Sequence, residues 1–391
     1  MKIHASNNQE RPEASPSQFN KGGSIYKPLI NGIDTLVMGF YVSEFNLSED
    51  DWKMLSENKE RAKSTIFKTA GIPVKFKSKE FTLRPAGKPP YTYVLVMEDI
   101  TVKIALRPSN GKFPEILVEF RSQFLWRGYI DAYLLITEWI KTWAFISAEI
   151  VSVVHLTLDI QGQPDIVFEN IVTKSRKKRE RYEVFSYGKE ITGYEFGSSP
   201  LKLIIYNKAK EIKTSHKFWF YDLWLKKRWD GGAPVFRVEY HLGRKMLKDF
   251  QIESFKDLRD TIPDMWRYLT QEWFTLRVKN NNDSNKTRWP LDPFWITVQK
   301  ALSRFGNIVG VERERIKEVK AEVLIPQAIG LISSVGALSG KNNFEESVRE
   351  INIKGSKHLK RKGKHFNDLL YEKKKKYAFY DDGEGGDNEA A

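Results

Sequence analysis

The sequence predicts an α+β fold, in which helices pack on a predominantly antiparallel sheet. Three short apolar strands are expected at 91–97, 100–106 and 115–120, and a Pro-Ser-Asn-Gly turn at 108–111 separates the last two. Strands that follow one another through short turns form an antiparallel meander. Segment 131–146 has its large apolar residues at helical spacing, which predicts a helix packed on that sheet.

Before the meander, a strand is expected at 33–45, and a helix should follow it. Ser48 and Asp51 fit a capping box, which begins a helix. The Gly-Ile-Pro run that starts at Gly71 is expected to end that helix, because glycine favours helix C-termini and proline cannot continue a helix.

Three further strands are expected in the middle of the chain, at 150–159, 201–208 and 235–242. They are short and rich in apolar or β-branched residues, and side chains two residues apart share one face of a strand. After them, helical patterning covers 250–278 with an interruption around Pro263.

The chain is expected to divide into four parts. Residues 1–24 are polar and predict a flexible tail, and 25–280 hold the sheet and its helices. Residues 281–340 begin with a polar linker and continue as a helical segment, with helices expected at 293–305 and 312–324. Residues 341–391 are basic and then acidic, which predicts a flexible tail.

The composition favours a polyanionic partner, and first of all nucleic acid. The chain has 391 residues, with 64 Lys and Arg against 50 Asp and Glu and a formal net charge of +14. It has no cysteine, which excludes disulfides, zinc–thiolate sites and cysteine nucleophiles. No apolar run reaches the roughly 20 residues that span a bilayer, so we expect a cytoplasmic protein without a membrane partner.

Tyr206 is the candidate nucleophile. The strand at 201–208 places Lys202, Tyr206 and Lys208 on one face. A phenol with an ordinary pKa of about 10 is a poor nucleophile, and neighbouring positive charge favours its phenolate form. The same pattern also fits a half-buried strand tyrosine with solvated lysines beside it.

Three motifs in order carry a resemblance to a known family. They are Val-Val-His-Leu-Thr-Leu-Asp at 153–159, Gly-Ser-Ser at 197–199 with Ile-Tyr-Asn-Lys at 205–208, and Phe-Arg-Val-Glu-Tyr-His-Leu at 236–242. Together they resemble the Rep_trans family of replication initiation factors over roughly residues 33–274. These proteins initiate rolling-circle replication of plasmids and some filamentous phages, and related relaxases act in conjugative elements. Family members usually carry Arg-x-Asp-x-x-x-Asp where this chain has Val153, His155 and Asp159, of which only Asp159 matches.

The resemblance implies that 25–280 is a DNA-nicking and strand-joining domain. Tyr206 would attack a phosphodiester and form a 5′-phosphotyrosyl link, which leaves a free 3′-hydroxyl. Lys208 or Arg237 would stabilise the negative charge that develops on the phosphate oxygens.

The resemblance also implies a metal site. Asp159 and Glu239 would hold Mg²⁺ or Mn²⁺, because hard oxygen ligands fit those ions. His155 shares a strand face with Asp159, so it is either a core residue or a metal ligand that replaces a missing carboxylate.

Two cationic stretches are candidates for binding DNA phosphates. The first precedes the Tyr206 strand and contains Lys174, Arg176, Lys177, Lys178, Arg179 and Arg181. Such a run is often a solvated loop, but its position fits a basic finger near the cut, and Lys202 would add to it. The second stretch is 354–376 in the C-terminal tail.

A second class of function stays open: a basic, aromatic-rich nucleic-acid-binding or regulatory protein that has the fold without the chemistry. A relaxase of a conjugative element is a further alternative. The expected partners are the origin DNA of a plasmid, phage or mobile element, a host helicase and a second copy of the chain as a homodimer.

Overall fold

The computed structural model describes residues 26–64, 70–106, 109, 111–174, 182–187, 190–306 and 321–370. The chain forms two compact units, Met1–Glu312 and Arg313–Ala391. Within the described part, no helix is both long and apolar enough to cross a bilayer.

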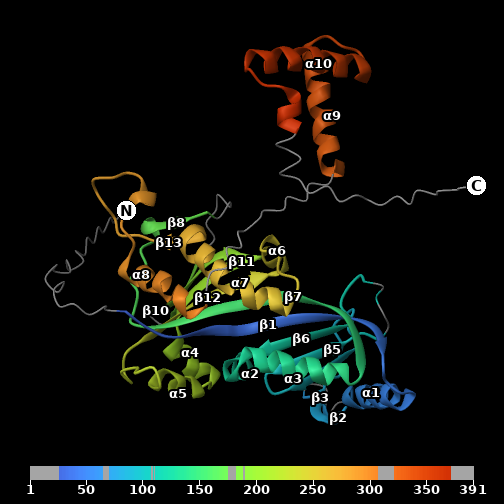
Figure 1. Ribbon diagram of the computed structural model, residues 1–391, viewed down its shortest axis with the longest axis vertical. Coiled ribbons are helices and arrows are strands. Elements are labelled where there is room, and N and C mark those ends of the chain that lie inside the picture. Colours follow the sequence, from blue (N-terminus) through green and yellow to red (C-terminus); the bar gives the residue numbers. More distant parts are fainter. Residues whose placement is uncertain are drawn as a thin grey trace, which may run out of the picture. The chain divides into compact units, whose positions relative to one another are not determined.

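The first unit is built on one large antiparallel sheet, which confirms the α+β prediction (Figure 1). In the described residues the sheet has eleven strands, in the order β2-β3-β4-β5-β6-β1-β7-β12-β11-β10-β9. The two longest, β1 (Lys27–Phe45) and β7 (Ala144–Gln161), pair along almost their whole length and join the two halves of the sheet.

Each half of the sheet is a set of shorter antiparallel strands. Beyond β1 lie β6 (Ile116–Arg121), β5 (Ile100–Ile104), β4 (Tyr93–Met97), β3 (Lys79–Leu83) and β2 (Ile72–Phe76). Beyond β7 lie β12 (Val235–Gly243), β11 (Leu201–Asn207), β10 (Glu190–Ser198) and β9 (Tyr182–Tyr187). A second, two-stranded sheet pairs β13 (Phe274–Leu276) with β8 (Ile171–Thr173). The half that contains β12 and β11 carries the candidate site.

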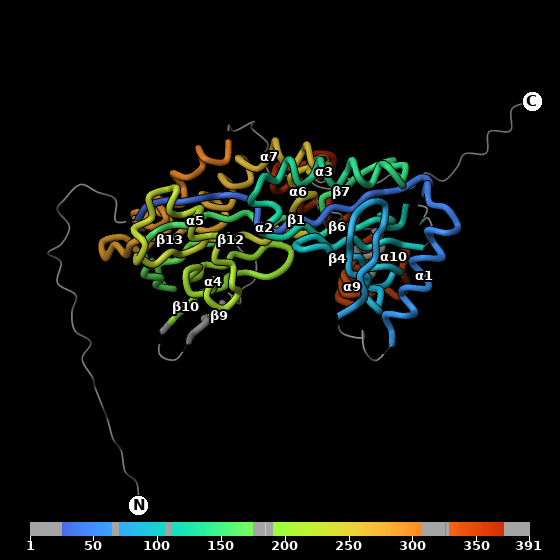
Figure 2. Tube along the Cα trace, turned by 90° about the horizontal axis from the view of Figure 1, so that it is seen from below, coloured from blue at the N-terminus to red at the C-terminus, as the bar shows by residue number. Residues whose placement is uncertain are grey.

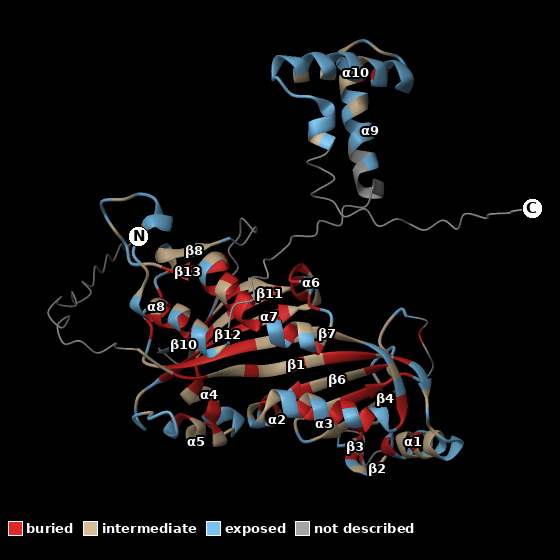
Figure 3. Ribbon diagram, viewed as in Figure 1, coloured by how far each residue is buried: buried red, intermediate tan, exposed pale blue. Residues whose placement is uncertain are grey.

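Helices cover both faces of the sheet. On one face lie α6 (Arg244–Asp249) and α7 (Phe255–Arg267), where the rings of Tyr240 and Trp266 are 5.6 Å apart at their centroids. On the other lie α2 (Ser122–Arg127), α4 (Lys208–Ser215) and α5 (Trp219–Leu225), and Figure 2 looks onto this face. The central strands and α7 are rich in buried residues (Figure 3).

Several element boundaries differ from the sequence prediction. Helix α1 (Glu49–Ala62) begins at the expected capping box of Ser48 and Asp51 but ends well before Gly71. A hairpin, β2–β3, follows Gly71 and was not predicted. Lys77 and Ser78 at its turn both have positive φ, and turns of this kind usually contain Asn-Gly, Asp-Gly or Gly-Gly instead.

Helix α3 (Tyr129–Lys141) ends earlier than the predicted 131–146, and β7 already begins at Ala144. Apolar residues at helical spacing continue into the strand, so periodicity alone did not locate the boundary. Pro263 lies inside α7 and does not interrupt it. A capping box formed by Ser254 and Asp257 begins α7, and burial of its apolar face offsets the hydrogen bond that proline removes.

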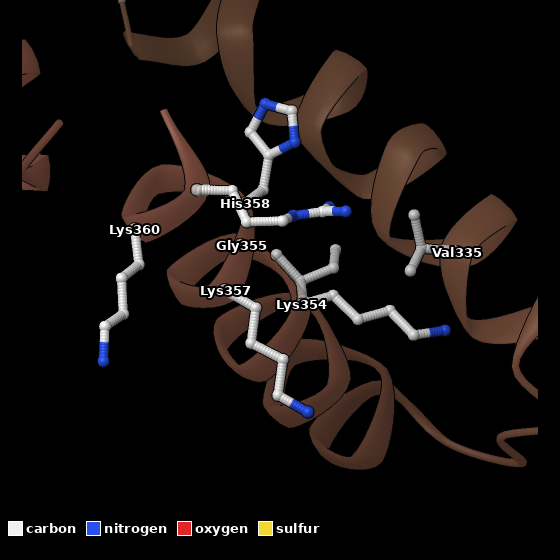
Figure 4. Close-up of a pocket in the computed structure, with 8 residues that line it drawn as sticks. Val335, Lys354, Gly355, Lys357, His358 and Lys360 are labelled. Carbon is white, nitrogen blue, oxygen red and sulfur yellow. The ribbon is translucent and has the colours of Figure 1, made fainter. Parts of the chain in front are cut away.

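The described residues of the second unit include the helices α9 (Ala321–Leu338) and α10 (Phe344–Arg361). Helix α10 occupies a region expected to be flexible, and the side chain of Asn343 caps it by accepting a hydrogen bond from the Glu346 backbone. The C-terminal half of α10 is cationic and borders a groove of about 990 Å³ with Val335 and Ile351 on its apolar side (Figure 4). The predicted tail from 371 onward and the predicted tail 1–24 lie outside the described residues.

Candidate active site

Strand register brings the candidate residues onto one face of the sheet. In β7 and β12, His155 pairs with His241 and Asp159 with Arg237, while in β12 and β11, Arg237 pairs with Tyr206. Side chains two residues apart point to the same face. The polar side chains of β7, β12 and β11 therefore gather on one face, where Trp224 and Phe220 of α5 contact Asp159 and Arg237. The apolar side chains of the same strands lie on the other face, where Tyr240 contacts Trp266 of α7.

Glu239 lies at the centre of a three-residue cluster. Its Oε1 is 2.8 Å from Nε2 of His241 and 3.2 Å from Nδ1 of His155. The two imidazole rings stack with centroids 3.6 Å apart and planes 6° from parallel. One donor atom of each residue lies within 4.8 Å of the others. Burial alone would raise the pKa of Glu239, but the hydrogen bonds to His155 and His241 hold it well below its ordinary value.

Tyr206 contacts this cluster directly. Its hydroxyl donates a hydrogen bond to Oε2 of Glu239 at 2.9 Å. Burial, and then the negative charge of Glu239, raises the pKa of Tyr206 well above its ordinary value. At neutral pH the side chain is therefore an uncharged phenol.

This corrects the expectation that neighbouring lysines favour a phenolate at Tyr206. Lys208 pairs with Glu211 at 2.6 Å, and Lys202 pairs with Glu195 at 2.9 Å. Each ammonium charge is thus balanced by a glutamate. Lys208 is almost fully buried, and burial together with the charge of Arg237 lowers its pKa.

A second cluster lies deeper, around the fully buried Arg237. The Nε–H of the guanidinium donates a hydrogen bond to Oδ1 of Asp159 at 2.6 Å, and Nη2 donates one to Oδ2 of the same residue at 3.0 Å. Its Nη1 donates to Oδ1 of Asp34 at 2.7 Å. The Trp224 indole donates to Asp159 Oδ2 at 2.9 Å. All three guanidinium nitrogens are therefore bound to protein carboxylates.

Asp34 completes this second cluster. It accepts hydrogen bonds from the Ser122 hydroxyl at 2.8 Å and the Trp126 indole at 3.1 Å, besides the one from Arg237. Burial would raise the pKa of Asp34, but the charge of Arg237 lowers it below its ordinary value. Aromatic rings enclose the guanidinium, whose Cζ lies 4.7 Å from the Phe220 ring centroid.

The structure thus places the predicted residues in two adjoining groups. Glu239, His155 and Tyr206 form the first, and Asp159 and Arg237 belong to the second. Among the predicted DNA-binding residues, Lys174 pairs with Glu272 at 3.1 Å, and Arg176, Lys177, Lys178, Arg179 and Arg181 lie outside the described residues.

Sequence reasoning did not single out His241, Asp34 and Trp224 as site residues. His241 shares a strand face with Glu239, which was the available signal. Asp34 lies where the pairing of β1 with β7 shifts register between Ile33 and Thr35, and no sequence pattern announces such a bulge.

The first cluster can hold a divalent cation. Two imidazole nitrogens and one carboxylate oxygen converge from neighbouring strands, and this donor set suits divalent transition metals. Asp159 is placed differently, because both of its carboxylate oxygens already accept hydrogen bonds from Arg237 and Trp224.

Comparison with known proteins finds remote structural similarity. No family model matches the chain, and no curated protein matches it. The solved structure of a rolling circle replication initiator protein from Geobacillus stearothermophilus aligns with 74% of this chain and 99% of its own, at 14% sequence identity and a TM-score of 0.38.

Proposed function

We propose that the chain is a rolling-circle replication initiator that nicks one DNA strand at an origin, with Tyr206 as the nucleophile. The observation that carries the proposal is the hydrogen bond from the Tyr206 hydroxyl to Glu239, a carboxylate already shared by two imidazoles. The net charge of +14 and the ordered sequence motifs support a DNA substrate.

In the proposed step, Oη of Tyr206 loses its proton through its acceptor, Glu239 Oε2, to solvent. Oη then attacks phosphorus, so the Oη–P bond forms while the P–O3′ bond breaks. The released 3′ oxygen takes up a proton and becomes a free 3′-hydroxyl, and the 5′ end stays linked to Tyr206. Rejoining reverses these changes.

The resting electrostatics oppose this step. The pKa of Tyr206 is raised and the pKa of Glu239 is lowered, so the proton stays on the phenol. A divalent cation at His155, Glu239 and His241 would supply the missing positive charge and polarise the phosphate.

The donor set narrows the expected choice between Mg²⁺ and Mn²⁺. Mg²⁺ prefers oxygen ligands, whereas imidazole nitrogen is better suited to transition metals. We therefore propose Mn²⁺ with His241 as the third ligand, and we assign Arg237 and Asp159 a positioning role behind Tyr206 and Glu239.

The test is a nicking assay with Mn²⁺ on supercoiled DNA of the replicon that encodes the protein. Wild type should convert it to open circles and leave a covalent protein–DNA adduct that survives SDS. Tyr206→Phe should bind the DNA with nearly unchanged affinity and form no adduct, because the change removes only the phenolic oxygen. Tyr194→Phe, on the neighbouring strand β10, is the matched control and should remain active. An adduct trapped by Tyr206→Phe would refute the assignment of the nucleophile.

A non-catalytic DNA-binding protein is the second candidate. It is favoured by one observation: both carboxylate oxygens of Glu239 are engaged by protein side chains, one by the Tyr206 hydroxyl and the other by His155 and His241. A wild-type protein that binds its origin but forms no adduct in Mn²⁺ or Mg²⁺ would establish this alternative.

A further inference from the structure

The connection between α4 and α5 combines an exposed aromatic ring with positive charge. Phe218 is 50% exposed. Its ring centroid lies 5.8 Å from that of the exposed His216 and 6.2 Å from that of Tyr221. Lys217 lies between His216 and Phe218 in the chain. Phe220, two residues further along the chain, is fully buried and packs against Arg237 instead.

Hydrogen bonds connect this segment to the candidate active site. Lys217 Nζ donates to the Ser122 hydroxyl at 3.0 Å, and that hydroxyl donates to Asp34 at 2.8 Å. Asp34 in turn binds Arg237, which pairs with Tyr206 across β12 and β11. The segment 216–218 is therefore held beside the strand face that carries Tyr206.

A ring contact gives a second, independent connection. The Tyr221 ring, next to Phe218, has its centroid 5.7 Å from that of Trp224. The Trp224 indole donates to Asp159 in the Arg237 cluster. Phe218 is thus anchored to the site through helix α5 as well as through Lys217.

We propose that His216, Lys217 and Phe218 bind single-stranded DNA next to the scissile bond, with Phe218 stacking on an unpaired base and Lys217 neutralising a phosphate. An aromatic face accepts any base, and an adjacent cation attracts the backbone. Bases in a duplex are stacked on both sides, so the segment selects an unpaired strand. The immediate chain neighbours of Phe218 are a lysine and an imidazole on one side, and this charge fits a polyanion better than an apolar protein surface.

This inference rests on the proposed function, since it takes DNA as the substrate of Tyr206. It is tested by binding alone, in EDTA and in the full-length Tyr206→Phe protein, so no cleavage contributes. The probe is fluorescein-labelled oligo(dT) of about 20 nucleotides, which is long enough to cover an ordinary single-strand binding site. Binding is measured by fluorescence anisotropy. The matching duplex and an oligonucleotide of abasic units are measured beside it.

Adding Phe218→Ala should weaken oligo(dT) binding by about 5- to 150-fold, which is the usual effect of removing one base–aromatic stack. Phe218→Trp should retain binding. Phe218→Ala and Phe218→Trp should both leave the affinity for the duplex and for the abasic strand unchanged, because these two probes contain no unpaired base. Phe145→Ala is the matched control: Phe145 is 57% exposed, and it lies ten residues from His155 along β7, about 30 Å away.

Three results would overturn the proposal. One is unchanged oligo(dT) affinity in Phe218→Ala, another is an equal loss on the abasic strand, and the third is no oligo(dT) binding by the parent protein. In a plot of the logarithm of the oligo(dT) binding constant against the logarithm of the salt concentration, Lys217→Gln should reduce the slope by about 0.7. This is the change expected for the loss of one single-strand phosphate contact. If the wild type does not nick DNA but oligo(dT) binding still depends on Phe218, only the proposed function is refuted.

Discussion

Replacing Arg237 by methionine tests the buried cluster behind Tyr206. Methionine is apolar and of similar length, and the change leaves Asp159 and Asp34 without their shared cation. Breaking a buried ion pair by removing one partner costs about 3–5 kcal/mol. Asp159 keeps the Trp224 indole, and Asp34 keeps its other donors. We therefore expect the lower end of that range, about 3 kcal/mol in the free energy of unfolding.

The pH dependence of this loss has a definite sign. In the wild type, the charge of Arg237 lowers the pKa of Asp34, so that carboxylate stabilises the fold above its unfolded pKa of about 3.9 and loses this effect as the pH falls through the lower folded pKa. In Arg237→Met, burial without the cation should raise the pKa of Asp34 instead. Protonation then favours the folded state, so the variant should become more stable as the pH falls from 7 to 5.

Urea unfolding followed by tryptophan fluorescence at pH 7 and pH 5 measures both effects. The difference in free energy of unfolding between the variant and the wild type should be larger at pH 7 than at pH 5. Arg288→Met is the matched control, because Arg288 forms the same two-bond contact with Asp283, at 2.7 Å for each bond, on the surface. It should unfold at the wild-type urea concentration. An Arg237→Met protein as stable as the wild type at both pH values would refute the buried-cluster argument.

Three further predictions concern metal and DNA. Glu239→Gln and His241→Ala should each weaken Mn²⁺ binding by more than about tenfold in calorimetry without DNA, while Asp159→Asn should change it by less than about threefold; equal losses in all three would contradict the His-Glu-His site. Truncation after Asn343 should flatten the salt dependence of duplex binding by about 0.9 for each phosphate that the tail neutralises in the full-length protein, and an unchanged slope would show that the tail only solubilises the protein. Neutralising the four cations at 176–179 should lower nicking more than binding, whereas equal losses would indicate general electrostatic attraction.

Much of the fold follows from local sequence patterns. The meander, the strands around Tyr206 and Glu239, and the capping box at Ser48 were predicted because each depends on residues close together in the chain. The errors occur where tertiary packing, rather than local sequence, determines where an element begins or ends. Helical periodicity beyond Lys141 did not reveal that β7 begins at Ala144, and the helix-breaking tendency of Pro263 was overridden within α7.

The candidate site was predictable only in part, because its geometry depends on strand register. His155 and His241 are far apart in sequence, yet the pairing of β7 with β12 places them directly opposite. Local alternation shows which side chains share a face of one strand, but it does not show which residue of another strand lies opposite. The sequence therefore showed that Glu239 and His241 share a face of one strand, but not that His155 lies beside them.

The protonation state of Tyr206 shows the same limit in chemical terms. In the sequence its nearest charged neighbours on the strand face are Lys202 and Lys208, which would favour a phenolate. In the fold both lysines are paired with glutamates, and the hydroxyl of Tyr206 contacts the Glu239 carboxylate instead. Burial and this negative charge keep the phenol neutral. In the proposed mechanism, positive charge added at the cluster would have to activate Tyr206, so nicking should depend strictly on a divalent cation.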